Sequence, residues 1–193
     1  MRQVNTLSKD FYKHDTANVA SKLLGKMLFR RLGERFVGGI VVETEAYYGS
    51  KDPASRAYEG RKPYNRVMFE EAGRTFIYNV HRYWMLNVVA HKPGTVGGIL
   101  FRAIEPTMGV EIMRENRPVR ELTNLTSGPG KLTQALSIDK SLNGIPVTEN
   151  SSQIFLTEGV EVSRISTSHR IGVRRDLEEE LRFYIEGNQF LSR

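Results

Sequence analysis

The chain has 193 residues, of which 28 are lysine or arginine and 22 are aspartate or glutamate, so its net charge is +6 and nucleic acid is a natural class of partner. It contains no cysteine, which excludes disulfides and cysteine-bound metals and suits a reducing compartment. No apolar run approaches the ~20 residues of a membrane span and residues 1–16 lack the apolar core of a signal peptide, so we expect an intracellular protein, in cytoplasm and nucleoid or in a nucleus, that contacts no membrane.

The N-terminal quarter of the chain is predicted to hold one helix and a pair of strands. Residues 15–25 carry apolar side chains at helical spacing, a capping residue at the start (Asp15 or Thr16) and a glycine at the end. Residues 26–32 and 35–47 are apolar runs separated by a Gly-Glu turn, a pattern that predicts a β-hairpin.

A polar loop is predicted over residues 49–66, which are rich in glycine, proline and arginine. Loops of this length inside a compact domain are usually functional or disordered. Between residues 47 and 84, arginines and lysines alternate with tyrosine, phenylalanine and tryptophan. Cations interleaved with aromatic rings suit a surface that contacts both phosphates and bases, although most of these rings can equally belong to the core.

The rest of the chain is predicted to alternate strands with short helices. The expected strands are residues 74–80, 81–90, 97–105, 152–158, 160–165 and 181–187. Pro106 is expected to open a helix over 106–117, and residues 128–138 are expected to form another helix. Without an internal repeat or boundary, residues 1–193 are predicted to form a single α+β domain with a curved, mostly antiparallel β-sheet flanked by helices.

Two carboxylates lie at the end of the second predicted strand, in the stretch ETEAYYG. Alternate side chains of a strand share a face, so Val41, Glu43, Glu45 and Tyr47 are expected to point the same way. Strand rise alone separates the two glutamates by ~6.8 Å, and such a pair can supply a general acid and a general base. The same spacing suits the two carboxylates of an inverting glycoside hydrolase. Alternatively, the two glutamates have no catalytic role and lie at a solvated strand end, paired with nearby arginines.

Several motifs, in order along most of the chain, resemble the alkyladenine (3-methyladenine) DNA glycosylases of the mammalian type. They are VVETEAYYG followed by DPAS, NRVMFEEAGRTFIY, LNVVA, GGILFRAIEP, TSGPGKLTQAL, and RIGV followed by LRFYIEGNQFLSR. The resemblance implies a monofunctional base-excision repair enzyme that flips an alkylated or deaminated purine nucleotide out of double-stranded DNA and hydrolyses its N-glycosidic bond, leaving an abasic site. It implies no cofactor and no metal. A monomer is expected, because one lesion needs one protein face.

The resemblance also implies roles for individual residues near the paired glutamates. Glu45 matches the general base that activates a water, and Arg102 with the backbone of Val173 would hold that water. Glu43 is instead assigned to a salt bridge that braces the strand. The assignments of Glu45, Arg102 and Val173 follow from the matched motifs and not from spacing alone.

Substrate-binding residues are implied by the same motifs. Tyr47 and Tyr78 match the tyrosines that stack on the flipped base, and Asn87 matches the asparagine on the pocket floor. Arg56 stands where the family has a histidine that packs against the base. Because arginine is always charged, positively charged alkylated bases are expected to bind less well. A lesion-binding module without catalysis stays an alternative. The inverting glycoside hydrolase is disfavoured by the basic charge.

DNA-binding residues are implied at two further places. The family has a wedge residue, a side chain that is inserted into the base stack of the DNA. The segment NVHRYW differs from the family's wedge region, so His81 is the residue nearest to the wedge position and Tyr83 is the alternative. Arg82 lies between them. Lys131 lies at the start of a predicted helix and is expected to contact a DNA phosphate.

Overall fold

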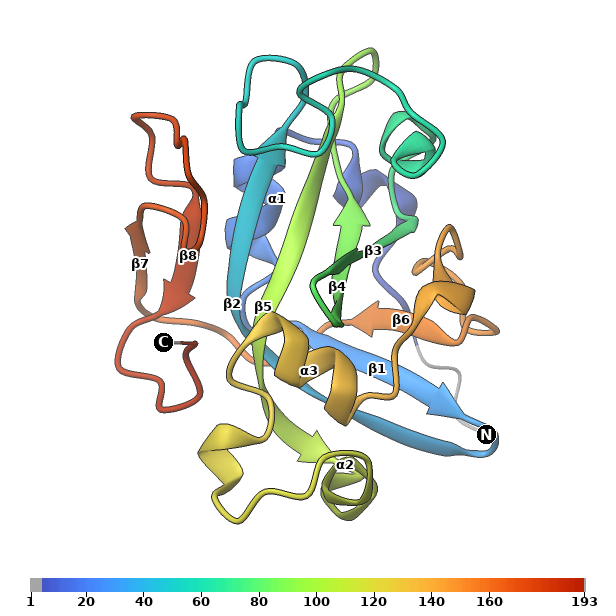
Figure 1. The fold of residues 1–193 in the computed structure, drawn as a ribbon. Helices are drawn as coiled ribbons and strands as arrows, with labels where there is room; N and C mark the ends of the chain where they lie inside the picture. The colour runs from blue at the N-terminus through green and yellow to red at the C-terminus, as the bar shows by residue number, and fades with distance from the viewer. Residues whose placement is uncertain (1–4, 193) are drawn as a thin grey trace.

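A curled antiparallel sheet with helices on both of its faces dominates the computed structural model, which describes residues 5–192 (Figure 1). The strands are β1 Met27–Leu32, β2 Arg35–Tyr48, β3 Thr75–Val80, β4 Tyr83–Val89, β5 Gly97–Met108, β6 Ile154–Thr157, β7 Ile165–Ser168 and β8 Arg182–Ile185. The α-helices are α1 Thr16–Lys22, α2 Val110–Asn116 and α3 Pro129–Ala135, and short 3-10 helices span Lys9–Tyr12, Arg66–Phe69, Leu122–Asn124 and Lys140–Leu142. The predicted α+β fold with a curved, mostly antiparallel sheet is confirmed.

Strand β2 connects the two parts of the sheet. The strand order is β3-β4-β5-β2-β1-β6, and β8 pairs with both β2 and β7. One edge of β2 pairs with β5 along most of its length, whereas the other edge pairs first with β1 and then, at Glu43–Glu45, with β8. Register shifts in the β2–β5 pairing fall at Gly38/Gly39, Val41/Glu43 and Glu43/Thr44, and such bulges bend a strand. The bend allows the β7–β8 hairpin to pack beside the second half of β2.

The two faces of β2 have different environments. Thr44 donates a hydrogen bond from Oγ1 to the carbonyl of Ala20 in α1 at 2.9 Å, so this face packs on the helix. Glu45 and Tyr47 lie on the opposite face. The predicted alternation is interrupted at the bulge: Val41 packs in the main core, and Val42 packs in a separate cluster with Ala103 and Phe190.

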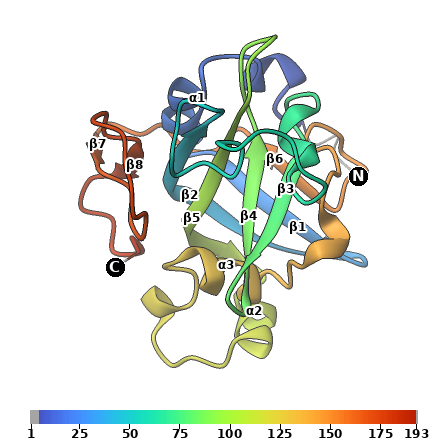
Figure 2. The same cartoon turned by 45° about the horizontal axis from the view of Figure 1, so that its top comes forward.

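Helix α1 and the loop after β2 confirm two predictions. Asp15 caps the helix, because its Oδ1 accepts hydrogen bonds from the backbone N–H groups of residues 17 and 18. Residues 49–65 contain no helix or strand. Asp52 accepts backbone hydrogen bonds from Tyr48 and Ala54, and Asn65 donates to the Arg56 carbonyl at 2.7 Å. Figure 2 brings this loop to the front of the molecule, with the β7–β8 hairpin to one side.

Two predicted elements were wrong. Pro106 does not open a helix: β5 continues to Met108, with Pro106 paired to Gly39 of β2, and α2 begins only after Gly109. Gly109 has a φ of 67°, a left-handed conformation that favours glycine and turns the chain from strand to helix. The strand predicted over 160–165 begins at Ile165, because its partner β8 pairs with residues 165–168.

The predicted single domain of residues 1–193 includes residues 1–4 and 193, which lie outside the described residues. Within residues 5–192, no helix is both long and apolar enough to cross a lipid bilayer.

Candidate active site

A cavity of about 810 Å³ opens between the second half of β2, the 49–65 loop, the β3–β4 hairpin and the chain segment that precedes β8. Tyr47, Arg56, Tyr78 and Arg102 line it, together with residues 171–175. Sequence segments that are far apart in the chain therefore contribute to one concave surface. A concave surface lined by aromatic side chains, with a few polar or charged groups among them, is the usual form of a binding site for a small molecule.

Glu45 lies directly behind this cavity wall and is fully buried. Its Oε1 accepts a hydrogen bond from the Ile171 backbone N–H at 2.7 Å and lies 3.0 Å from Nη1 of Arg102. Its Oε2 accepts a hydrogen bond from the Tyr47 hydroxyl at 2.7 Å. A carboxylate has about four lone-pair sites. Hydrogen bonds from Tyr47 and Ile171 occupy two of them, and the Arg102 guanidinium lies beside Oε1 as an ion pair, which leaves capacity for a further donor such as water.

The backbone N–H that contacts Glu45 belongs to Ile171, two residues before Val173, whose backbone the resemblance assigns to the catalytic water. Val173 lines the cavity, two residues further along the same segment. The motif RIGV contains both residues, so the motif located the segment but not the contact. Only the chain path shows which N–H points at the carboxylate.

Glu43 lies at the centre of a buried ionic group that we call the Glu43 cluster: Glu43, Arg102, Arg182 and Ser192. Its Oε1 accepts hydrogen bonds from Nε of Arg102 at 2.9 Å and Nε of Arg182 at 2.7 Å. The Ser192 backbone N–H donates to Oε2 at 2.6 Å. The predicted structural salt bridge of Glu43 is confirmed. Burial opposes the charged form of Arg102, but the charges of Glu45 and Glu43 raise the pKa of its guanidinium above the ordinary value.

A second buried ionic group, the Arg170 cluster, consists of Arg170, Asp52 and Asp176. Arg170 binds Asp52 through both Nη atoms, at 2.7 and 2.8 Å, and Asp176 through Nε at 2.8 Å and Nη2 at 2.6 Å. Its Nη1 also donates to the Ala46 carbonyl at 2.9 Å. The guanidinium lies 4.5 Å from the centroid of the Tyr47 ring. Sequence reasoning missed this cluster, and its only signal was that Asp52 and Arg170 belong to or adjoin the motifs DPAS and RIGV.

Tyr47 is therefore held from two sides. Its hydroxyl donates to Glu45, and its ring contacts the buried Arg170 guanidinium. Burial, followed by the charge of Glu45, raises the pKa of the Tyr47 phenol well above its ordinary value. The phenol consequently stays a hydrogen-bond donor at neutral pH.

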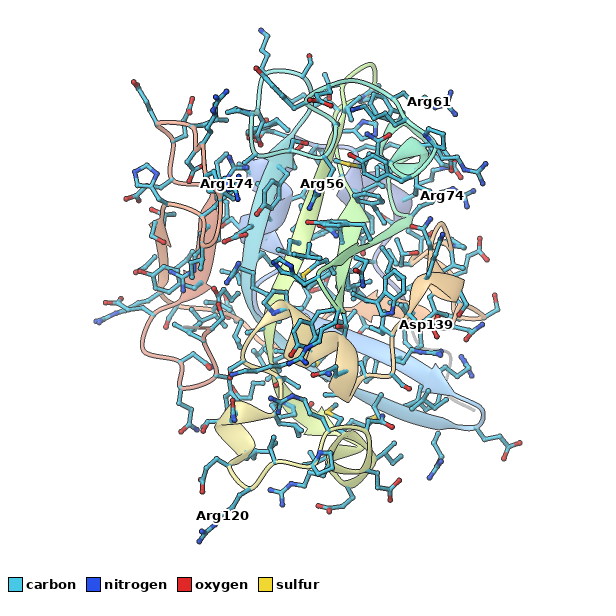
Figure 3. The ribbon with its side chains drawn as sticks, in the orientation of Figure 1. Arg56, Arg61, Arg74, Arg120, Asp139 and Arg174 are labelled. Carbon is cyan, nitrogen blue, oxygen red and sulfur yellow. The ribbon has the colours of Figure 1, made fainter. Side chains whose placement is uncertain are left out.

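Tyr78 and Asn87 lie on the other side of the cavity. The Arg56 guanidinium lies 4.7 Å from the centroid of the Tyr78 ring, and Phe76 stacks on the same ring at 5.2 Å. Asn87 donates from Nδ2 to the carbonyls of Phe76 and Met85. Asn87, Tyr47, Tyr78 and Arg56 share an inner space of about 10 Å³, which is about one water molecule in size. Figure 3 shows Arg56 over the centre of the sheet and Arg174 beside it on the C-terminal segment.

The predicted DNA-binding residues lie at the β3–β4 hairpin and at α3. His81 and Arg82 form the exposed tip of the hairpin, where His81 has a φ of 54°. Tyr83 packs against Gly130, where a Cβ atom would lie 2.9 Å from the ring. Lys131 donates to Oδ1 of Asn124 at 2.5 Å. The hairpin and α3 are thus in direct contact, and the hairpin tip is the exposed part.

No cluster of three or more histidine, cysteine, aspartate or glutamate side chains suited to a metal ion occurs among residues 5–192.

Comparison with known proteins assigns the chain to a family. The family profile described as methylpurine-DNA glycosylase matches residues 10–189. A protein of Aeropyrum pernix is 43% identical over 97% of this chain and 93% of its own length. Proteins of Mesorhizobium japonicum and Bacillus subtilis are 41% and 37% identical, over 92% and 100% of this chain and 86% and 99% of their own lengths. All three are assigned as 3-methyladenine DNA glycosylases.

Proposed function

The chain belongs to the methylpurine-DNA glycosylase family, and we propose that it is a monofunctional DNA glycosylase that removes alkylated or deaminated purines from double-stranded DNA inside the cell. In this proposal residues 1–193 act as one glycosylase domain, as a monomer and without a cofactor. The observation that carries the proposal is the environment of Glu45. A buried carboxylate with two hydrogen-bond donors, an ion pair to Arg102 and remaining lone-pair capacity lies directly behind the wall of a cavity lined by tyrosine and arginine.

Glu45 is the general base of the proposed reaction. It takes a proton from a water molecule, whose oxygen forms a bond to C1′ of the damaged nucleotide. The bond between C1′ and the base nitrogen breaks, and its electron pair leaves with the base. Arg102 and the Ile171 N–H support this role, because both keep the Glu45 carboxylate in place through its Oε1. A water nucleophile leaves an abasic site with both strands intact.

The damaged nucleotide has to leave the base stack before this reaction, because a stacked nucleotide hides C1′ from the protein. Tyr47 and Tyr78 are proposed to stack on the extruded base, with Asn87 and Arg56 at its edge. The inner space of about 10 Å³ is too small for a purine. We therefore expect Arg56 to move off the Tyr78 ring when a base enters.

DNA contacts are proposed for the hairpin and for α3. His81 is the wedge that fills the stack, and its exposed place at the hairpin tip supports this role. Arg82 and Lys131 are proposed to contact phosphates, and Tyr83 to support the tip by its packing on Gly130. Val173 contributes to the cavity wall.

The two rival functions fit this site less well. An inverting glycoside hydrolase needs two carboxylates that both face the substrate, whereas Glu43 is buried with its oxygens bonded inside the Glu43 cluster. A lesion-binding module would not need a carboxylate with an open lone-pair site behind the cavity. Catalysis is therefore the function that these contacts support best.

The test compares wild type with Glu45→Gln on duplexes that carry one hypoxanthine, one 1,N6-ethenoadenine or one 3-methyladenine, followed by alkali. We expect alkali-dependent strand breaks with wild type and a rate that is about a hundred- to ten-thousandfold lower with Glu45→Gln. Glu34→Gln makes the same chemical change at the exposed β1–β2 turn and should keep the wild-type rate. Tight binding of a lesion duplex without breaks, unchanged in Glu45→Gln, would instead identify a lesion-binding protein.

A further inference from the structure

Two of the three tyrosine rings that line the cavity, those of Tyr47 and Tyr78, each contact an arginine guanidinium group. Arg170 lies 4.5 Å from the Tyr47 ring centroid and Arg56 lies 4.7 Å from the Tyr78 ring centroid. Arg170 contacts its ring from inside the protein, because its side chain is fully buried. The negative face of an aromatic ring attracts cations. At these two rings, the protein's own arginines already occupy the position that such a cation would take.

The rest of the cavity is also positively charged. Arg102, Arg174 and Arg175 line it together with Arg56, and Glu59 is the acidic residue among its lining side chains. Glu59 is paired with Lys62. Within residues 5–192, no ion pair joins Arg56, Arg174 or Arg175 to a carboxylate, so their charges are directed at the cavity and the solvent around it.

The buried ionic clusters offset only part of this charge. Arg102 and Arg182 together balance Glu43 and Glu45, whereas Arg170 faces two carboxylates, those of Asp52 and Asp176. The clusters therefore carry one net negative charge, against the three positive charges of Arg56, Arg174 and Arg175. A ligand in the cavity meets mainly the charge of Arg56, which lies on the ring that the ligand would have to stack on.

We infer that the cavity selects electrically neutral damaged purines, such as deaminated ones, over purines that carry a positive charge after ring alkylation. This inference rests on the proposed glycosylase function and ranks the substrates of that function by their charge. A neutral base can stack on Tyr78 and accept hydrogen bonds from Arg56, which presents several N–H donors. A cationic base at the same place meets a like charge at short range.

The experiment measures single-turnover excision from two matched duplexes, one with hypoxanthine, which is neutral, and one with 7-methylguanine, which is cationic. Cationic purines also leave more readily without an enzyme, so the informative quantity is the ratio of the two rates and its change in variants. Arg56→Gln removes the charge at similar side-chain length, Arg56→Lys retains it, and Arg61→Gln removes a charge from the same loop outside the cavity. Arg61 lies away from Arg56 in Figure 3.

We expect Arg56→Gln to raise the rate on 7-methylguanine relative to hypoxanthine about tenfold, which corresponds to about 1.4 kcal/mol. Arg56→Lys and Arg61→Gln should keep the wild-type ratio within about threefold. An unchanged ratio in Arg56→Gln, or an equal change in Arg61→Gln, would overturn the inference and leave the glycosylase function in place. Wild type that excises neither lesion would overturn the proposed function, and this inference with it.

Discussion

The two ionic clusters beside the cavity have opposite compositions. The Glu43 cluster places one carboxylate between two guanidinium groups, and its members come from β2, β5, β8 and the C-terminal segment. The Arg170 cluster places one guanidinium between two carboxylates, both from irregular segments. The first cluster links three neighbouring strands of the sheet to the C-terminal segment. The second cluster links the loop after β2 to the segment between β7 and β8, and neither of these belongs to a strand ladder.

This difference shows how the side chains of the site are positioned. Arg102 is fixed by the sheet and holds Glu45 through an ion pair. Arg170 is fixed by the two loops and contacts the Tyr47 ring, and the next residue, Ile171, donates a hydrogen bond to Glu45. Glu45 therefore depends on both clusters, one through a charge and the other through a backbone N–H. Because these loops belong to no strand ladder, we expect the Arg170 cluster to matter more for folding.

The largest effect is expected from Arg170→Met. The change leaves Asp52 and Asp176 without their cation, and breaking a buried ion pair from one side costs about 3–5 kcal/mol. Urea unfolding should report a loss of this size in the free energy of unfolding. Arg120→Met, at a side chain that is 97% exposed, should change it by less than about 0.5 kcal/mol.

A loss below about 1 kcal/mol in Arg170→Met would contradict the ranking of the two clusters. It would mean that the loops are held by contacts other than this guanidinium. Excision rates measured on the folded fraction of the same variant would then show whether Tyr47 still has its wild-type position.

A smaller effect is expected from Glu43→Gln. Arg102 keeps Glu45 as its partner, and only Arg182 loses its counter-charge, so we expect a loss of about 1.5–3 kcal/mol in urea unfolding. The double variant Glu43→Gln with Arg182→Met should recover part of this loss, because it removes the unpaired cation. A double variant less stable than Glu43→Gln alone would show that Arg182 stabilises the fold by other contacts.

The contrast between the clusters also explains what the sequence could predict of the fold. Strand period and turn residues located β1, β2, β5 and α1, because these signals are local. Pro106 misled the prediction, since its place in β5 is decided by pairing with Gly39 of β2. The start of β7 was missed for the same reason, because β8 sets its register. Pairing between distant segments leaves no local pattern.

The same limit applies to the candidate site: contacts between distant segments leave no local pattern in the sequence. Alternation along β2 indicated Glu45 and Tyr47 on one face, and the family motifs indicated Arg102, Tyr78 and Asn87. The partners of Arg170 could not be predicted, because Asp52 and Asp176 lie in segments with neither strand nor helix period. The contact of Ile171 with Glu45 depends on how such a segment is folded, and the motif RIGV alone did not indicate it.

The smallest effect is expected from Asp176→Asn, and it depends on pH. Burial alone would raise the pKa of Asp176, but hydrogen bonds from Arg170 and the Arg170 charge lower it below the ordinary value. A carboxylate whose pKa is lowered by folding stabilises the folded state above the unfolded pKa of about 3.9, and this contribution is lost as the pH falls through the folded pKa. The variant should therefore be about 1–2 kcal/mol less stable than wild type near neutral pH, and the difference should shrink below about pH 4. Asp10→Asn, whose ion pair with Lys13 is exposed, should show little difference at either pH. A difference between wild type and Asp176→Asn that stays constant down to about pH 3 would mean that Asp176 acts by shape and hydrogen bonding and not by its charge, and that the Arg170 cluster is in effect a pair of Arg170 with Asp52.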